Sequence, residues 1–110
     1  MEEEERIQQL RQTIAEYAKA RAEQDHLDEF KKSKLALLMK EYEAQGVSAV
    51  NAQEREARAD ERYIQVLEGL REATETAERL RWELKLKEMQ FDMWREKQWN
   101  RRAERKRYEA

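Results

Sequence analysis

The feature that most constrains this chain is its lack of residues that stop a helix. The sequence has no proline, and its two glycines, Gly46 and Gly69, stand alone. Alanine, glutamate, lysine, arginine, glutamine and leucine dominate, and all of them favour helices. Charged residues make up 44% of the chain, which by itself is compatible with disorder. The regular spacing of the apolar residues instead predicts long helices with buried faces.

Apolar residues recur in steps of three and four along the first part of the chain. The first members are Ile7, Leu10, Ile14 and Tyr17. This is heptad spacing, which puts the side chains on one face of a helix. Residues 35–39 form the densest apolar patch, which surrounds more than half of a helix. We expect this patch to be fully covered.

One break stands out in the helical pattern. Gly46 fits the left-handed residue that ends a helix, and Ser48 fits the N-cap of the next one. The sequence predicts a single helical domain over 1–110, with a helix at about 3–45, a turn at 46–48 and a helix at about 49–107.

Two positions within the second helix need separate interpretation. Asp60 could cap a restart, so both a break near 59–60 and a continuous helix are open at this point. Gly69 lies within the periodic pattern and indicates a close helix contact rather than a break.

A short loop between two long helices favours an antiparallel hairpin. With the turn at Gly46–Val47, Leu10 is expected near Glu83, and Ile7 near Leu86. The first helix then runs out near residue 90 of the second, whose end projects beyond it. The predicted fold is therefore all-α: a long, coiled-coil-like antiparallel helical hairpin, within an oligomeric helical bundle.

The second helix is apolar on two opposite faces. The face expected to pack on the first helix holds Val66, Leu70, Ala73, Ala77, Leu80, Leu84, Phe91 and Trp94. The opposite face holds Trp82, Leu86, Met89 and Met93, here called the Trp82 stripe. Because one hairpin cannot cover both faces, we interpret the stripe as an oligomer interface, with a homodimer as the simplest case. A groove for a different protein is the alternative.

Charge is concentrated at the carboxyl end of the chain. Residues 95–110 hold seven basic and three acidic side chains, a net charge of +4. We call residues 94–108 the basic arm. Its candidate contact residues are Arg95, Lys97, Trp99, Arg101, Arg102, Arg105, Lys106 and Arg107.

Basic side chains mixed with aromatic rings suit nucleic acid, because cations neutralise phosphates and rings stack on bases. Trp99 is the first candidate, since it lies outside both apolar faces of the helix. Two alternatives stay open for the arm. It could bind a protein partner. It could also be a plain helix end, whose basic residues complement the helix dipole and lie close to the acidic residues 2–5 in the hairpin.

Other chemistry has little support in the sequence. There is no cysteine, and the one histidine, His26, sits among acidic residues as a surface side chain would. No glycine-rich phosphate loop or nucleophile motif is present. We therefore expect no enzyme activity, metal, cofactor or small-molecule substrate. No apolar stretch is long enough for a membrane span, and the acidic residues 2–5 are unlike a signal peptide, so a cytoplasmic location is expected.

Between Val50 and Glu104 the chain carries a further pattern. It consists of Asn51–Ala57, Tyr63, Leu67–Leu70, Ala73–Thr74, Leu80–Leu84, Phe91, Trp94–Arg95 and Arg101–Glu104. In these positions the chain resembles small helical proteins of tailed bacteriophages and prophages. Genes for such proteins often lie among recombination and replication genes, beside those for single-strand annealing and single-strand binding proteins.

This resemblance implies a non-enzymatic accessory role in phage DNA recombination or replication, in the bacterial host cytoplasm. The basic arm would then bind DNA or a DNA-bound recombination or replication protein. Two other functions stay open. One is a structural assembly protein, such as a capsid scaffold whose basic helix grips acidic shell subunits. The other is an inhibitor of a host nuclease or defence complex that binds through the Trp82 stripe.

Overall fold

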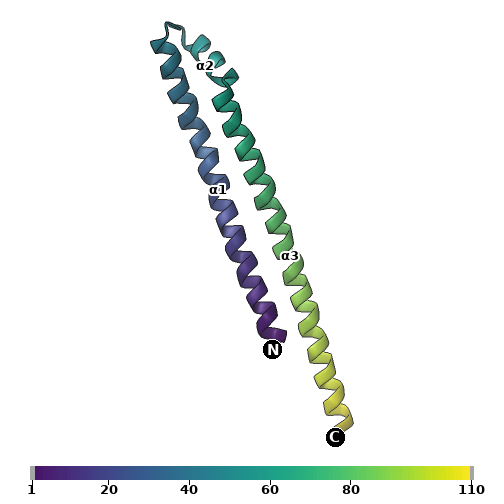
Figure 1. Ribbon diagram of the computed structural model, residues 1–110. Helices are drawn as coiled ribbons and strands as arrows, with labels where there is room; N and C mark the ends of the chain where they lie inside the picture. Colours follow the sequence, from purple (N-terminus) through teal and green to yellow (C-terminus); the bar gives the residue numbers. More distant parts are fainter. Residues whose placement is uncertain (1, 110) are drawn as a thin grey trace. The chain divides into compact units, whose positions relative to one another are not determined.

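The computed structural model describes residues 2–109, and three helices account for nearly all of them (Figure 1). They are α1 (Glu2–Ala44), α2 (Val50–Ala59) and α3 (Glu61–Glu109). Contacts divide the chain into two units. The terminal unit joins the residues up to 17 with those from 79 onward, and the turn unit is residues 18–78.

Within each unit, α1 and α3 run antiparallel. In the terminal unit, Lys87 Nζ donates to Thr13 Oγ1 at 2.8 Å, while the earlier Arg6 lies over the later Trp94. In the turn unit, Gln24 Nε2 donates to Thr74 Oγ1 at 3.2 Å. The prediction of an all-α antiparallel helical hairpin is confirmed, and its assembly into an oligomer stays a prediction. None of the described helices contains a segment long and apolar enough to cross a bilayer.

The end of α1 is closed by its own backbone. Gly46 has a φ of +103°, which a residue with a side chain rarely adopts. Its N–H donates to the carbonyl of Glu43, and the N–H of Val47 donates to the carbonyl of Tyr42. This pair of hydrogen bonds is a Schellman motif, and it satisfies carbonyls that the helix leaves without partners.

Ser48 is not the N-cap of the next helix, contrary to the sequence-based expectation. The cap is Ala49, which has extended backbone and makes no side-chain capping hydrogen bond. Ser48 lies one residue too early to reach the free N–H groups of α2. The turn is held instead by Gln53, whose buried Nε2 donates to the carbonyl of Val47 at 2.8 Å.

The second helix is broken at Asp60, where α2 ends and α3 begins. Asp60 has extended backbone, and its Oδ1 accepts the backbone N–H of Arg62 at 2.8 Å. This is an N-cap for α3. Asp60 Oδ2 also accepts the hydroxyl hydrogen of Tyr42 in α1 at 2.8 Å. The cap therefore fixes the start of α3 against the end of α1.

The core of the turn unit lies next to this break. Its buried members are Leu38, Ala57 and Tyr63, against which Leu35, Met39 and Tyr42 pack. The expectation that residues 35–39 are fully covered is wrong, because Ala36 is exposed and Leu37 is 56% exposed, whereas Leu38 is buried. Neighbouring side chains point about 100° apart on a helix, so Leu37 faces away from the surface that Leu38 buries.

Gly69 does not mark a close helix contact. A Cβ atom built at this position would lie 4.0 Å from Cδ1 of Leu27, which is an ordinary packing distance. The helices of the turn unit are therefore far enough apart here to admit a small side chain.

The pairing of helices in the terminal unit differs from the predicted register. Leu10 lies beside Phe91, not Glu83, and Thr13 contacts Lys87. The shift is about seven residues, or two helical turns. The shift is already present beside the turn, where Tyr42 donates a hydrogen bond to Asp60 although a tight turn at Gly46–Val47 would place it near Asn51. It therefore arises between the end of α1 and the start of α3, where residues 45–49 and Asp60 lie outside the helices.

A shift of one heptad leaves the matching of faces intact. All eight residues of the predicted packing face, from Val66 to Trp94, are buried or half-buried. The shifted register changes the surroundings of the basic arm. Glu2 and Glu3 line the same depression as Trp99 and Arg102, so the first part of the arm lies beside α1 rather than projecting alone.

Candidate nucleic-acid interface

The basic arm is the last part of α3. Arg95, Lys97, Trp99, Arg101, Arg102, Arg105, Lys106 and Arg107 are all exposed. Within residues 2–109, none of the arm's basic side chains forms an ion pair. Lysine and arginine are good helix formers, so the arm stays helical without burying any of these residues. The Arg95 guanidinium lies 5.7 Å from the ring centre of Phe91, and the other cationic groups of the arm are left available to a partner.

Helical geometry places seven of the arm's eight contact candidates on two faces, and Arg107 lies outside both. Residues three, four and seven apart lie on one side of a helix. Arg95, Trp99, Arg102 and Lys106 follow this spacing, and we call them the Trp99 face. Lys97, Arg101 and Arg105 lie about a third of a turn away, and we call them the Arg101 face. The Trp99 side chain is 71% exposed. The Trp99 face therefore presents an indole among three cations.

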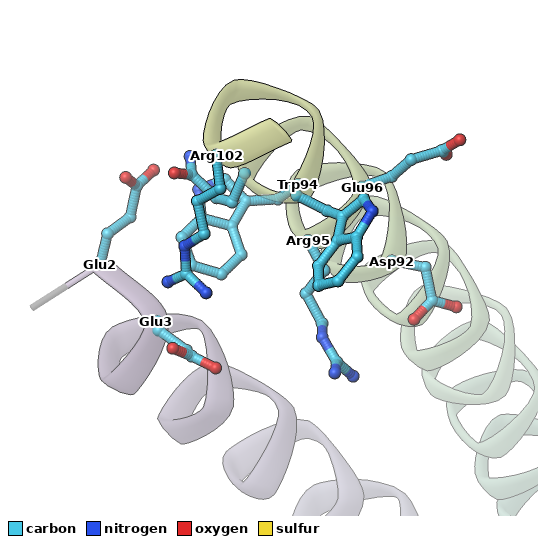
Figure 2. A pocket seen from close by; sticks show the side chains of 9 residues that line it. Glu2, Glu3, Asp92, Trp94, Arg95, Glu96 and Arg102 are labelled. Atoms are coloured by element: carbon cyan, nitrogen blue, oxygen red, sulfur yellow. The ribbon is translucent and has the colours of Figure 1, made fainter. Parts of the chain in front are cut away.

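The start of α1 borders the Trp99 face. An open depression is lined by Glu2, Glu3, Asp92, Trp94, Arg95, Glu96, Gln98, Trp99 and Arg102 (Figure 2). It brings together three of the predicted contact residues and leaves the others outside. Because its acidic members repel phosphate, they weaken and orient any contact between the arm and an anion.

Arg6 links this acidic border to the aromatic side chains of α3. Its Nη2 donates to Glu2 Oε1 at 3.1 Å, and its guanidinium lies 5.2 Å from the ring centre of Trp94. The Trp94 ring stacks on Phe91 with centres 6.0 Å apart. Arg6 therefore occupies the aromatic surface at the base of the arm.

These contacts affect the charge of Glu2. The pKa of its carboxyl is lowered, chiefly because Arg6 donates a hydrogen bond to it, with smaller effects from the Trp94 N–H and from Arg101. The Trp94 N–H is buried, and within the described residues no acceptor forms a hydrogen bond with it. Sequence reasoning missed Arg6 at this site because the predicted register placed it two turns away.

The Trp82 stripe lies on the side of α3 that does not pack on α1. Trp82, Leu86, Met89 and Met93 are between 54% and 62% exposed. Two cations cover part of the indole: Lys85 Nζ lies 4.6 Å from a ring centre of Trp82, and the Arg81 guanidinium lies 5.8 Å away. The stripe is thus an apolar surface with charged residues close by.

His26 is exposed and stacks on Phe30, with ring centres 6.0 Å apart. Over residues 2–109, no group of three or more histidine, aspartate or glutamate side chains is arranged to hold a metal ion.

No protein-family model, curated protein or solved structure matches the chain.

Proposed function

We propose that this protein is a non-enzymatic accessory protein that binds nucleic acid through the Trp99 face of the basic arm. The observation that carries the proposal is the exposed indole of Trp99, set among Arg95, Arg102 and Lys106. Folding does not account for a tryptophan so exposed on a charged helix. A ligand with both phosphates and ring faces would use all four side chains.

Single-stranded nucleic acid fits this surface better than a duplex. Stacking on an aromatic side chain contributes about 1–3 kcal/mol per base and requires an unpaired base. The cations bind phosphates by displacing counterions, which makes the affinity depend on salt. Because Glu2 and Glu3 border the face, we expect the affinity to be modest.

We further propose a role in phage DNA recombination or replication, in the host cytoplasm. This part rests on the resemblance carried by residues 50–104. In that setting the protein would work on single-stranded DNA intermediates, or on a protein bound to them. The same resemblance supplies no catalytic residues, so we propose binding without catalysis.

The test is fluorescence anisotropy with labelled single- and double-stranded oligonucleotides, at low and at near-physiological salt. Reversing two charges of the Trp99 face, R102E with K106E, is compared with R101E and R105E. Both variants change the net charge of the same arm equally. We expect the first variant to weaken binding at least about tenfold more than the second, and W99A to weaken it about tenfold.

Circular dichroism establishes that all variants keep the helical content of the parent chain. Absence of binding by the intact chain would overturn the proposal. Equal losses in the two double variants would mean that the arm acts through bulk charge, without the Trp99 face. Absence of binding, in contrast, would make a protein partner the better interpretation of the arm.

A further inference from the structure

The Trp82 stripe continues a pattern that extends beyond its four apolar residues. On the same side of α3, Arg79 lies three residues before Trp82, and Glu96 lies three residues after Met93. The stripe is thus flanked by a cation at one end and an anion at the other. Both flanking residues are exposed.

One edge of the stripe repeats this arrangement. Lys85 and Asp92 lie along it, one heptad apart, and both are exposed. The opposite edge carries Glu83 and Gln90 in the corresponding places. Along both the stripe and the edge that holds Lys85 and Asp92, positive charge comes first in the chain and negative charge comes later.

A surface with this polarity is complementary to itself only when the second copy is reversed. We propose that the Trp82 stripe binds the same stripe of a second copy of this chain, with the two α3 helices antiparallel about a two-fold axis between residues 87 and 88. Trp82 then packs on Met93 of the second copy, and Leu86 packs on Met89. Each contact occurs twice because of the symmetry.

The antiparallel register pairs Arg79, Lys85, Asp92 and Glu96 each with an opposite charge. Arg79 meets Glu96 of the second copy, and Lys85 meets Asp92 of the second copy. The two-fold axis doubles both pairs, so four ion pairs surround the apolar contact. Such pairs contribute mainly to orientation and specificity.

A parallel pairing in the same register has the opposite electrostatics. It sets Arg79 against Arg79 and Glu96 against Glu96 at the ends of the stripe, and like charges in these positions repel. The charge pattern therefore selects the antiparallel dimer. Since the stripe faces away from α1, the two α3 helices meet directly, with the α1 segment of each terminal unit on its far side.

The first test is the association state of the full chain, measured by sedimentation equilibrium from about 5 to about 500 µM. We expect a monomer–dimer equilibrium. L86E should raise the dimer dissociation constant at least about a hundredfold, because it puts two carboxylates into the apolar contact. The matched control is L37E on α1, since Leu37 is 56% exposed and Leu86 is 54% exposed. This variant should leave the dissociation constant unchanged.

The second test fixes the register, and it is clean because the sequence contains no cysteine. Chains carrying W82C are mixed with chains carrying M93C under mild oxidation. We expect a disulfide between the two kinds of chain and none within either kind alone. In the antiparallel register, two copies of residue 82 lie 11 residues apart, which is about 16 Å along the helix and too far for a disulfide.

Charge reversal tests the register without removing apolar side chains. K85D alone and D92K alone should each raise the dissociation constant about tenfold, since each turns two attractive pairs into repulsive ones. The double variant, K85D with D92K, should restore the parent value.

A monomer at all concentrations would overturn the dimer and leave the stripe to a different protein. Self-linking of W82C, or failure of the double variant to recover, would overturn the antiparallel register.

This inference stands independently of nucleic-acid binding. Residue 86 belongs neither to the Trp99 face nor to the depression that borders it, so oligonucleotide anisotropy on L86E reports the arm alone. Retained binding by a monomeric L86E would show that the arm works without the dimer. Dimerisation of a W99A chain would show that the dimer forms without the arm's aromatic contact.

Discussion

Asp60 is the residue on which several contacts of the turn unit converge. It accepts hydrogen bonds from the backbone N–H and the guanidinium of Arg62 and from the hydroxyl of Tyr42. Arg62 also pairs with Glu41 of α1 at 2.8 Å. These donors, Arg62 first, hold the pKa of the Asp60 carboxyl well below its usual range. The hydrogen bond between the Tyr42 hydroxyl and Asp60 also raises the pKa of Tyr42.

The pKa of Asp60 predicts how stability depends on pH. Because its pKa is lower in the folded chain than in the unfolded chain, its contribution is complete above about pH 4 and is lost as the pH falls through the folded value. D60N should therefore be less stable than the parent at pH 7, and the difference should narrow as the pH falls toward 2. Urea unfolding at pH 7, 4 and 2.5 measures this. A constant difference across the series would contradict the prediction.

Y42F is the control for the second donor to Asp60. It removes one hydrogen bond but keeps the carboxylate and the cap of α3. The raised pKa of Tyr42 stabilises the fold below its unfolded value of about 10, and this is lost as the pH rises through the folded value. Because Arg62 is the main cause of the lowered pKa of Asp60 and Tyr42 a smaller one, Y42F should keep most of the parent's acid dependence and lose the alkaline part.

At the scale of single helices, the sequence predicted some ends and missed others for a definite reason. Gly46 was identified because a left-handed residue restricts the choice of amino acid. Ser48 was misassigned because a hydroxyl caps only where the backbone turns into the helix, and Gln53 holds the turn from farther along the chain. A side chain that returns to the loop from the next helix leaves no local pattern in the sequence.

The two glycines of the chain provide a matched test at this scale. G69A should stabilise the protein by about 1 kcal/mol, because alanine favours a helix and its Cβ would meet only Leu27 Cδ1 at 4.0 Å. G46A should destabilise it by roughly 1–2 kcal/mol, because φ is +103° although no atom lies within 4 Å of the added Cβ. Thermal unfolding of both variants measures these changes. Destabilisation by G69A would show that the helices do approach closely at this position.

At the scale of the whole molecule, the faces of the helices were predictable and their register was not. Heptad spacing identified the buried face of α3 and the exposed Trp82 stripe, because the periodicity of a helix depends only on the sequence. The register depends on how many residues lie outside helices at the turn and at Asp60. Counting these from the sequence requires the cap of each helix, and one of the two caps was misassigned. The candidate arm residues and the nearby acidic residues 2–5 were identifiable from the sequence, whereas the contact of Arg6 with Trp94 depended on the register.

The two units differ in how much they bury, and this predicts unequal stability along the same helices. The turn unit buries Leu38, Ala57, Tyr63, Ala77 and Gln53, whereas the buried side chains of the terminal unit are Leu80 and Thr13. Regions with fewer buried contacts open more often. In a dilute, monomeric sample, backbone amides of residues 6–17 and 79–95 should therefore exchange hydrogen at least about tenfold faster than those of 30–42 and 61–72.

Concentration separates this effect from self-association. If the Trp82 stripe pairs with a second copy, protection of residues 79–95 from hydrogen exchange should rise at concentrations where the dimer forms. Association with a second folded chain stabilises the folded form of the terminal unit. Protection of residues 30–42 should stay the same, and L86E should abolish the rise. Hydrogen exchange followed by mass spectrometry at two concentrations measures both quantities. Uniform exchange along α1 and α3 in the dilute sample would mean that the two units open together, and that the small core of the terminal unit is stabilised by the helices that continue out of it.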